Sequence, residues 1–241
     1  MLLTRLPVAR FARFGGPADL ARCVWAFPVV GVVVGGIGGL IYWLGRWVGM
    51  PPLLGAVWAL AVTMILTGGL HEDGLADTAD GFGGGASPGR KMEIMRDSRI
   101  GSYGALALVL SVVIRVGALA ALDRPMIVLC AMIVAGMVGR SGILVLLLAL
   151  PAVRADGMGA SVGRPSAGRA GVGLGLAVVA ALLLLQARPA IAVIVLGFGA
   201  ASIMARVAHS QIGGHTGDVL GASEVVTECV VLTVVACSFG G

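Results

Sequence analysis

Long apolar runs, separated by short polar stretches, dominate this chain of 241 residues. A helix of about 17–25 apolar residues is long enough to cross the hydrocarbon core of a bilayer. Charged residues make up 12% of the chain, about half the share of a soluble protein, and the mean hydropathy is +1.01. Runs such as ALAVVAALLLLQ do not alternate as barrel strands do. We therefore predict an all-α, polytopic membrane bundle of about seven spans in a single domain, 1–241. The expected spans are 24–44, 53–70, 103–121, 126–150, 170–187, 190–207 and 225–240.

The distribution of arginine predicts how the chain is oriented. Arginines precede the first span, namely Arg5, Arg10, Arg13 and Arg22, in a stretch that we expect to be an amphipathic segment on the membrane surface. Basic residues concentrate in cytoplasmic loops, so the N-terminus is placed in the cytoplasm. Seven crossings put the stretches 71–102, 151–169 and 208–224 on the same side. The opposite loops carry about one arginine each: Arg46, Arg124 and Arg188.

The stretch GGLHEDGLADTADGFGGG, residues 68–85, concentrates acidic side chains in this apolar chain. On a helix, Asp73, Asp77 and Asp80 would share one face and repel one another unless a cation neutralises them. Carboxylate oxygens suit Mg²⁺ or Mn²⁺, which often link a protein to a substrate phosphate. We therefore predict a metal and phosphate-transfer site built on these aspartates, with Glu72 as a further ligand and His71 as a substrate contact.

Glycines and basic residues follow the acids in 81–104. Gly81, Gly83 and Gly84 are expected to let a diphosphate approach the backbone. Basic side chains suit phosphate groups, and the candidates are Arg90, Lys91, Arg96 and Arg99. Asp97, four residues after Glu93, could extend the metal site. An alternative stays open for the basic set, in which it reflects cytoplasmic topology and ion pairs on a helix surface.

A second polar cluster, GGHTGDVLGASEVVTE, lies at residues 213–228. We expect 213–224 to fold over the site built by 71–102, with Asp218 and Glu224 adding metal or ribose contacts. His215 is the candidate acid or base, and Thr216 a substrate contact. Glu228 falls inside the last span, where an acid is costly and usually functional. The alternative is that Glu228, together with Glu224, neutralises an intramembrane arginine, Arg115 or Arg140.

These two clusters resemble the signature segments of the cobalamin synthase family, the adenosylcobinamide-GDP ribazoletransferases. TRLPV near the start and FPVVG at 27–31 also resemble segments of that family, so the likeness extends along the whole chain. The resemblance implies a Mg²⁺-dependent enzyme in the bacterial inner membrane, with its active site facing the cytoplasm. It also implies the substrates, adenosylcobinamide-GDP and α-ribazole or its 5′-phosphate, and the release of GMP. Self-association and association with other cobalamin-assembly enzymes stay open.

Two other functions remain to be separated from this one. CDP-alcohol phosphotransferases share the opening of their motif with Asp77-Thr78-Ala79-Asp80-Gly81, but no Ala-Arg follows here. A transporter would place its charges near the bilayer midplane, whereas most charge here lies in loops on one side. The sequence contains no basic patch interleaved with aromatic residues, so it does not indicate nucleic-acid binding. The sequence leaves open the general base, the number of metal ions and the orientation of the corrinoid.

Overall fold

The computed structural model describes residues 21–154 and 162–240, so the expected N-terminal amphipathic segment lies outside the described residues. Within these ranges the regular elements are helices, which confirms the all-α prediction. Six helices are long and apolar enough to cross a membrane, and a bent pair can form a seventh span. The helices are η2 (Val24–Ala26), α2 (Phe27–Trp47), α3 (Pro52–Thr67), α4 (Leu70–Gly84), α5 (Pro88–Ile94), α6 (Ser102–Leu122), α7 (Pro125–Ala149), α9 (Ala167–Leu184), α10 (Ala187–Ile212) and α11 (Gly217–Phe239). The chain is therefore a multi-pass membrane protein.

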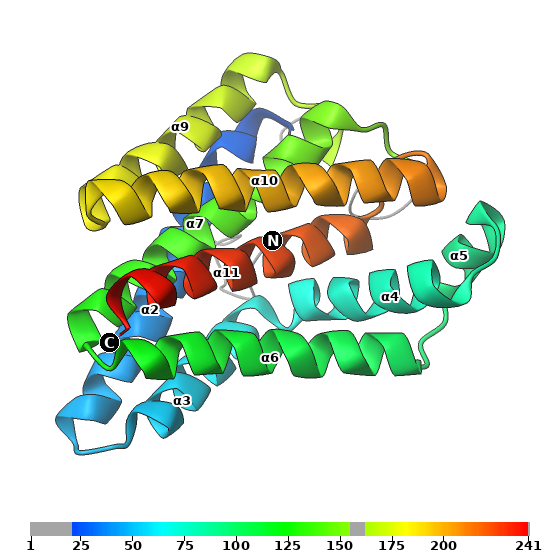
Figure 1. Ribbon diagram of the computed structural model, residues 1–241. Coiled ribbons are helices and arrows are strands. Elements are labelled where there is room, and N and C mark those ends of the chain that lie inside the picture. Colours follow the sequence, from blue (N-terminus) through cyan, green and yellow to red (C-terminus); the bar gives the residue numbers. More distant parts are fainter. Residues whose placement is uncertain (1–20, 155–161, 241) are drawn as a thin grey trace, which may run out of the picture.

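Helix α7 forms the centre of the bundle and packs against α2, α9, α10 and α11. Glycines at the α2–α7 crossing allow this contact, because a side chain at Gly31 or Gly35 would collide with the backbone of α7. Close approach through small residues is the usual way for helices to pack in lipid, where the hydrophobic effect does not drive association. On the other side of the bundle, α4 lies between α6 and α11 and contacts both (Figure 1).

A sharp bend lies at the C-terminal end of the expected second span, 53–70. Helix α3 ends at Thr67, and the chain bends by 89° before α4 begins at Leu70. The two residues at the bend, Gly68 and Gly69, have φ angles of 72° and 67°, a left-handed conformation that favours glycine. The bend turns α4 to run alongside α6 and α11 (Figure 1). The acidic stretch is therefore a helix inside the bundle and not part of a loop over 71–102.

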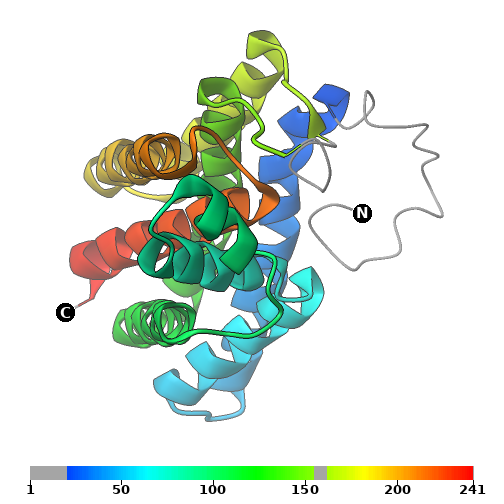
Figure 2. The same cartoon turned by 90° about the vertical axis from the view of Figure 1, so that its right-hand side faces the viewer.

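The polar connections meet at one end of the bundle, which we call the polar end. It holds α5, the connection after α7 and the turn 213–216 between α10 and α11, and Figure 2 looks onto this end. The backbone N–H of His215 donates to the carbonyl of Pro151 at 2.9 Å, and that of Val153 donates to His215 at 3.0 Å. The helix connections 48–51, 123–124 and 185–186 lie at the opposite end (Figure 1).

The expected loop over 208–224 is mostly helical. Helix α10 continues to Ile212, because Ala205, Ala208 and Ile212 form a buried face. Helix α11 begins at Gly217, eight residues before the expected start of the last span. Its first turn is capped by Thr216, whose hydroxyl accepts a hydrogen bond from the backbone N–H of Val219 at 3.3 Å. The loop is thus reduced to residues 213–216.

Candidate active site

Helices α4 and α11 touch through their glycines at the polar end. A Cβ atom at Gly74 would lie 2.7 Å from the carbonyl oxygen of Asp218, and one at Gly221 would lie 3.2 Å from the Cα of His71. Real Cβ atoms do not approach backbone as closely as the first distance, so Gly74 is required for this contact. The close approach brings Asp218 of α11 next to the aspartates of α4.

Four aspartates from the two helices lie within electrostatic reach of one another. The carboxylate of Asp77 interacts with those of Asp73, Asp80 and Asp218, and Asp73 also interacts with Asp218. Asp73 is exposed, whereas Asp77 and Asp218 are half-buried. The structure therefore brings the aspartates of the two sequence clusters together, and we call Asp73, Asp77, Asp80 and Asp218 the aspartate group.

The chemistry of the aspartate group fits Mg²⁺, although its side chains do not form a complete metal cage. In the described part of the chain, no three histidine, cysteine or acidic side chains lie close enough together to hold a metal ion. Magnesium seldom needs such a cage, because one or two carboxylates usually bind it together with waters and substrate phosphates. Asp73, Asp77 and Asp218 supply carboxylates of this kind, and a cation among them would relieve their mutual repulsion.

Asp80 differs from the other three aspartates because both of its carboxylate oxygens accept hydrogen bonds from backbone amides. It accepts hydrogen bonds from the N–H of Gly101 at 2.7 Å and of Gly104 at 2.8 Å. These amides belong to the first turn of α6, where a carboxylate is favourable because it satisfies unpaired donors and faces the positive end of the helix dipole. Asp80 therefore fixes the end of α4 to the start of α6. Its predicted roles in catalysis and metal binding would add to this structural one.

The glycines after Asp80 are explained by helix packing. A Cβ atom at Gly81 would lie 2.5 Å from Met95, and one at Gly83 would lie 2.7 Å from the ring of Tyr103. Space for a diphosphate is therefore not needed to account for Gly81 and Gly83. Gly84 is exposed and faces a pocket instead.

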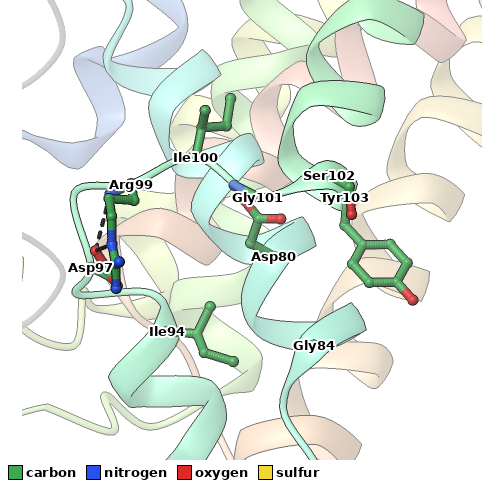
Figure 3. Close-up of a pocket in the computed structure, with 9 residues that line it drawn as sticks. All are labelled: Asp80, Gly84, Ile94, Asp97, Arg99, Ile100, Gly101, Ser102 and Tyr103. Atoms are coloured by element: carbon green, nitrogen blue, oxygen red, sulfur yellow. Dashed lines mark hydrogen bonds and ion pairs between the residues drawn. The ribbon is translucent and has the colours of Figure 1, made fainter.

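An open pocket of about 480 Å³ lies between the end of α4, the end of α5 and the start of α6 (Figure 3). Asp80 and Tyr103 form one side, and the Asp97–Arg99 pair forms the other. Arg99 binds Asp97 at 2.7 Å, and its side-chain and backbone hydrogen bonds lower the pKa of the Asp97 carboxyl to about 2. Asp97 is thus held by Arg99 across the pocket from Asp80, and its role in extending the metal site stays a prediction.

Basic residues within 90–99 form ion pairs and hydrogen bonds at the surface, as the alternative interpretation of this set predicts. Arg90 pairs with Glu93, one turn away on α5, at 2.7 Å. Lys91 is hydrogen-bonded to the side-chain oxygen of Gln211 and so ties α5 to the end of α10. Arg96 is exposed on the same segment. Glu93 and Gln211, the partners of Arg90 and Lys91, lie outside the aspartate group.

Arg154 is a residue of the site that the sequence patterns did not single out. It follows α7 in the chain, in the stretch 151–169 for which the sequence predicts only a cytoplasmic location. Its Nη1 atom lies 3.4 Å from the Oδ2 atom of Asp218, and its Nη2 donates to the carbonyl of Met92 at 3.1 Å. Only the tertiary structure reveals this position, because Arg154 and Asp218 are 64 residues apart.

His215 and Thr216 are both buried in the turn before α11. Burial lowers the pKa of the His215 imidazole, which is therefore neutral at neutral pH. Its Nδ1 atom is buried and has no hydrogen-bond partner in the part of the chain that the structure describes. Thr216 lies 3.2 Å from the Oδ2 atom of Asp218 and donates a hydrogen bond to it. We conclude that Thr216 orients Asp218, in addition to capping α11.

Three residues expected at the metal or substrate belong to a buried ion-pair network. Glu224 lies 2.9 Å from Arg140 and 3.3 Å from the Nδ1 atom of His71, and Glu72 lies 2.9 Å from Arg115. Their carboxylates neutralise arginines inside the bundle, which favours a structural role for Glu72, Glu224 and His71. Metal binding by Glu72 and Glu224 and substrate binding by His71 stay predictions.

Glu228 completes this network between the two arginines. It lies 3.4 Å from Arg115 and 3.5 Å from Arg140. The alternative interpretation of Glu228, as the partner of an intramembrane arginine, is therefore the one that the structure supports. Charges buried in this way must be paired, because an isolated charge in the membrane is costly.

Comparison with known proteins connects this site to one enzyme family. The chain is 44% identical over 234 residues to the adenosylcobinamide-GDP ribazoletransferase of Bradyrhizobium diazoefficiens, covering 97% of this chain and 90% of the relative. It is 43% identical to the enzyme of the same name from Mesorhizobium japonicum, covering 97% and 89% of the two chains. No solved structure matches the chain. The sequence profile of cobalamin-5-phosphate synthase matches residues 1–236, and the chain therefore belongs to this family.

Proposed function

We propose that this protein joins adenosylcobinamide-GDP to α-ribazole, or to α-ribazole 5′-phosphate, and releases GMP. The product is adenosylcobalamin or its 5′-phosphate. Membership of the family and the name of its relatives support this reaction. The structural observation that carries it is the convergence of Asp73, Asp77 and Asp218 from two helices at the polar end.

The reaction exchanges a phosphoanhydride bond for a phosphate ester bond. A ribose hydroxyl oxygen forms a bond to the phosphorus attached to cobinamide, and the bond from that phosphorus to the GMP oxygen breaks. GMP leaves with the bonding electron pair, and a carboxylate of the aspartate group accepts the hydroxyl proton. Such transfers depend chiefly on positioning and on neutralising the charge of the phosphates. We propose that Asp73, Asp77 and Asp218 hold Mg²⁺, or Mn²⁺, which supplies this neutralisation.

The test is the release of GMP by purified protein in detergent. With adenosylcobinamide-GDP, α-ribazole and Mg²⁺, we expect GMP and adenosylcobalamin in equal amounts, and we expect EDTA to stop the reaction. A transporter would yield no GMP in the absence of a sealed membrane. Folded protein that releases no GMP with either metal would refute the proposal, and a CDP-alcohol offered in parallel tests the phospholipid alternative.

We further propose that the polar end faces the cytoplasm of a bacterial cell, in its inner membrane. The basic residues of this end support this orientation. Single cysteines at the exposed positions Ala86, Ser166 and Ser210, in a chain without its native cysteines, are expected to react with an impermeant maleimide only after the membrane is opened. A cysteine at exposed Gln186 of the opposite end should react in intact spheroplasts. The reverse pattern would show the opposite orientation.

A further inference from the structure

Arg154 lies where three parts of the polar end meet. Its guanidinium touches Asp218 of α11 and the carbonyl of Met92 in α5, and it stands in the connection that follows α7. It acts electrostatically on Asp77 as well as on Asp218. Arg154 therefore interacts electrostatically with two aspartates that belong to different helices.

The charges at this end single out Arg154 among its neighbours. The aspartate group carries four carboxylates, and the contacts of three other basic residues lead away from it. Arg90 binds Glu93, Lys91 binds Gln211 and Arg99 binds Asp97. Of these four basic residues, Arg154 is the one whose guanidinium contacts the aspartate group.

The guanidinium of Arg154 also has hydrogen-bonding capacity to spare. Its contact with Asp218, at 3.4 Å, is longer than the roughly 2.7–2.9 Å of a strong charge-assisted hydrogen bond. Its Nε atom is buried and has no hydrogen-bond partner among residues 21–154 and 162–240. A buried N–H of this kind is costly unless another molecule satisfies it. An oxyanion beside the aspartate group would satisfy it, and a phosphate can take two parallel N–H bonds from one guanidinium.

We propose that Arg154 is the arginine that binds the phosphate transferred by this enzyme, and that it provides the counter-charge of the aspartate group before substrate arrives. The proposal rests on the proposed function. As the bond to GMP breaks, negative charge spreads over the phosphate oxygens, and a guanidinium donating to them stabilises that state. In the free protein the same positive charge competes with a divalent cation for Asp77 and Asp218.

Removing the charge of Arg154 should therefore raise the affinity for the metal ion but lower the rate of GMP release. Arg154→Gln should bind Mn²⁺ about tenfold more tightly in the absence of substrate, because a nearby positive charge no longer opposes the ion. The same variant should release GMP about 100-fold more slowly, because the phosphate loses its donor. Arg154→Lys keeps the charge but lacks the planar fork, so its Mn²⁺ affinity should stay near that of the wild type while its turnover falls.

The experiment measures free Mn²⁺ by electron paramagnetic resonance, GMP release and thermal unfolding on the same detergent-purified proteins. Arg169→Gln is the control, because it removes one exposed arginine at the start of α9 and should change neither binding nor turnover. If Arg154 were only structural, Arg154→Gln would weaken Mn²⁺ binding and lower the melting temperature together. That result, or turnover within twofold of the wild type, would overturn the proposal. A wild-type protein that releases no GMP would instead refute the proposed function.

Discussion

Asp77→Asn is expected to slow GMP release by about 100-fold or more and to leave the protein at least as heat-stable as the wild type. Asp77 is half-buried and interacts with the carboxylates of Asp73, Asp80 and Asp218. Asparagine keeps the shape of the side chain but removes its charge, and with it a ligand for the proposed metal. The same change relieves repulsion among like charges, so the melting temperature should stay the same or rise. Loss of activity without loss of stability is typical of a residue retained for function.

The control for this variant is Glu93→Gln on α5. Glu93 is an exposed acid at the same end, paired with Arg90 and outside the aspartate group. It should release GMP at close to the wild-type rate. Turnover of Asp77→Asn within about twofold of this control, in folded protein, would remove Asp77 from the site and leave Asp73 and Asp218 as its candidates.

The sequence predicts the class of the fold better than the course of its second span. Apolar length is sufficient to identify helices that cross a membrane, because every backbone polar group in lipid must be satisfied within the helix. Such a count does not detect the bend at Gly68 and Gly69, since glycine is compatible with an apolar run. The two adjacent glycines were a local signal, because consecutive left-handed residues are easily formed only by glycine. Without the bend, the acidic helix α4 would not lie inside the bundle.

The acidic spacing predicts which side chains face one another, but it cannot predict their partners. The expectation that Asp73 and Asp77 share a helix face rested on local geometry, and the structure places both of them in the aspartate group. The roles of Glu72 and Asp80 depend on contacts with residues 43 and 21–24 positions away. Acids in one short stretch thus separate into metal-ligand candidates, a helix cap and a partner of Arg115. Only the packing of α4 between α6 and α11 makes this distinction.

The most destabilising single change is expected at Glu224, on the buried side of α11. Glu224 and Arg140 are each 1% exposed and lie 2.9 Å apart, and Glu224 also contacts His71. Glu224→Gln would leave Arg140 inside the bundle without its nearest negative charge. Breaking one side of a buried pair typically costs about 3–5 kcal/mol, so the melting temperature in detergent should fall markedly.

Glu228→Gln is the matched control, one turn further along the same helix. Glu228 is the more distant partner of both arginines, because Arg140 is closer to Glu224 and Arg115 is closer to Glu72. Its replacement should therefore lower the melting temperature less than Glu224→Gln does. A second comparison tests whether the cost comes from the unpaired charge itself. The double variant Arg140→Gln with Glu224→Gln should lose less stability than the two single variants added together, since it leaves no unpaired arginine at that position. Equal stability of Glu224→Gln and the wild type would mean that Arg140 does not depend on Glu224. The negative charge that neutralises Arg140 inside the bundle would then have to come from Glu228.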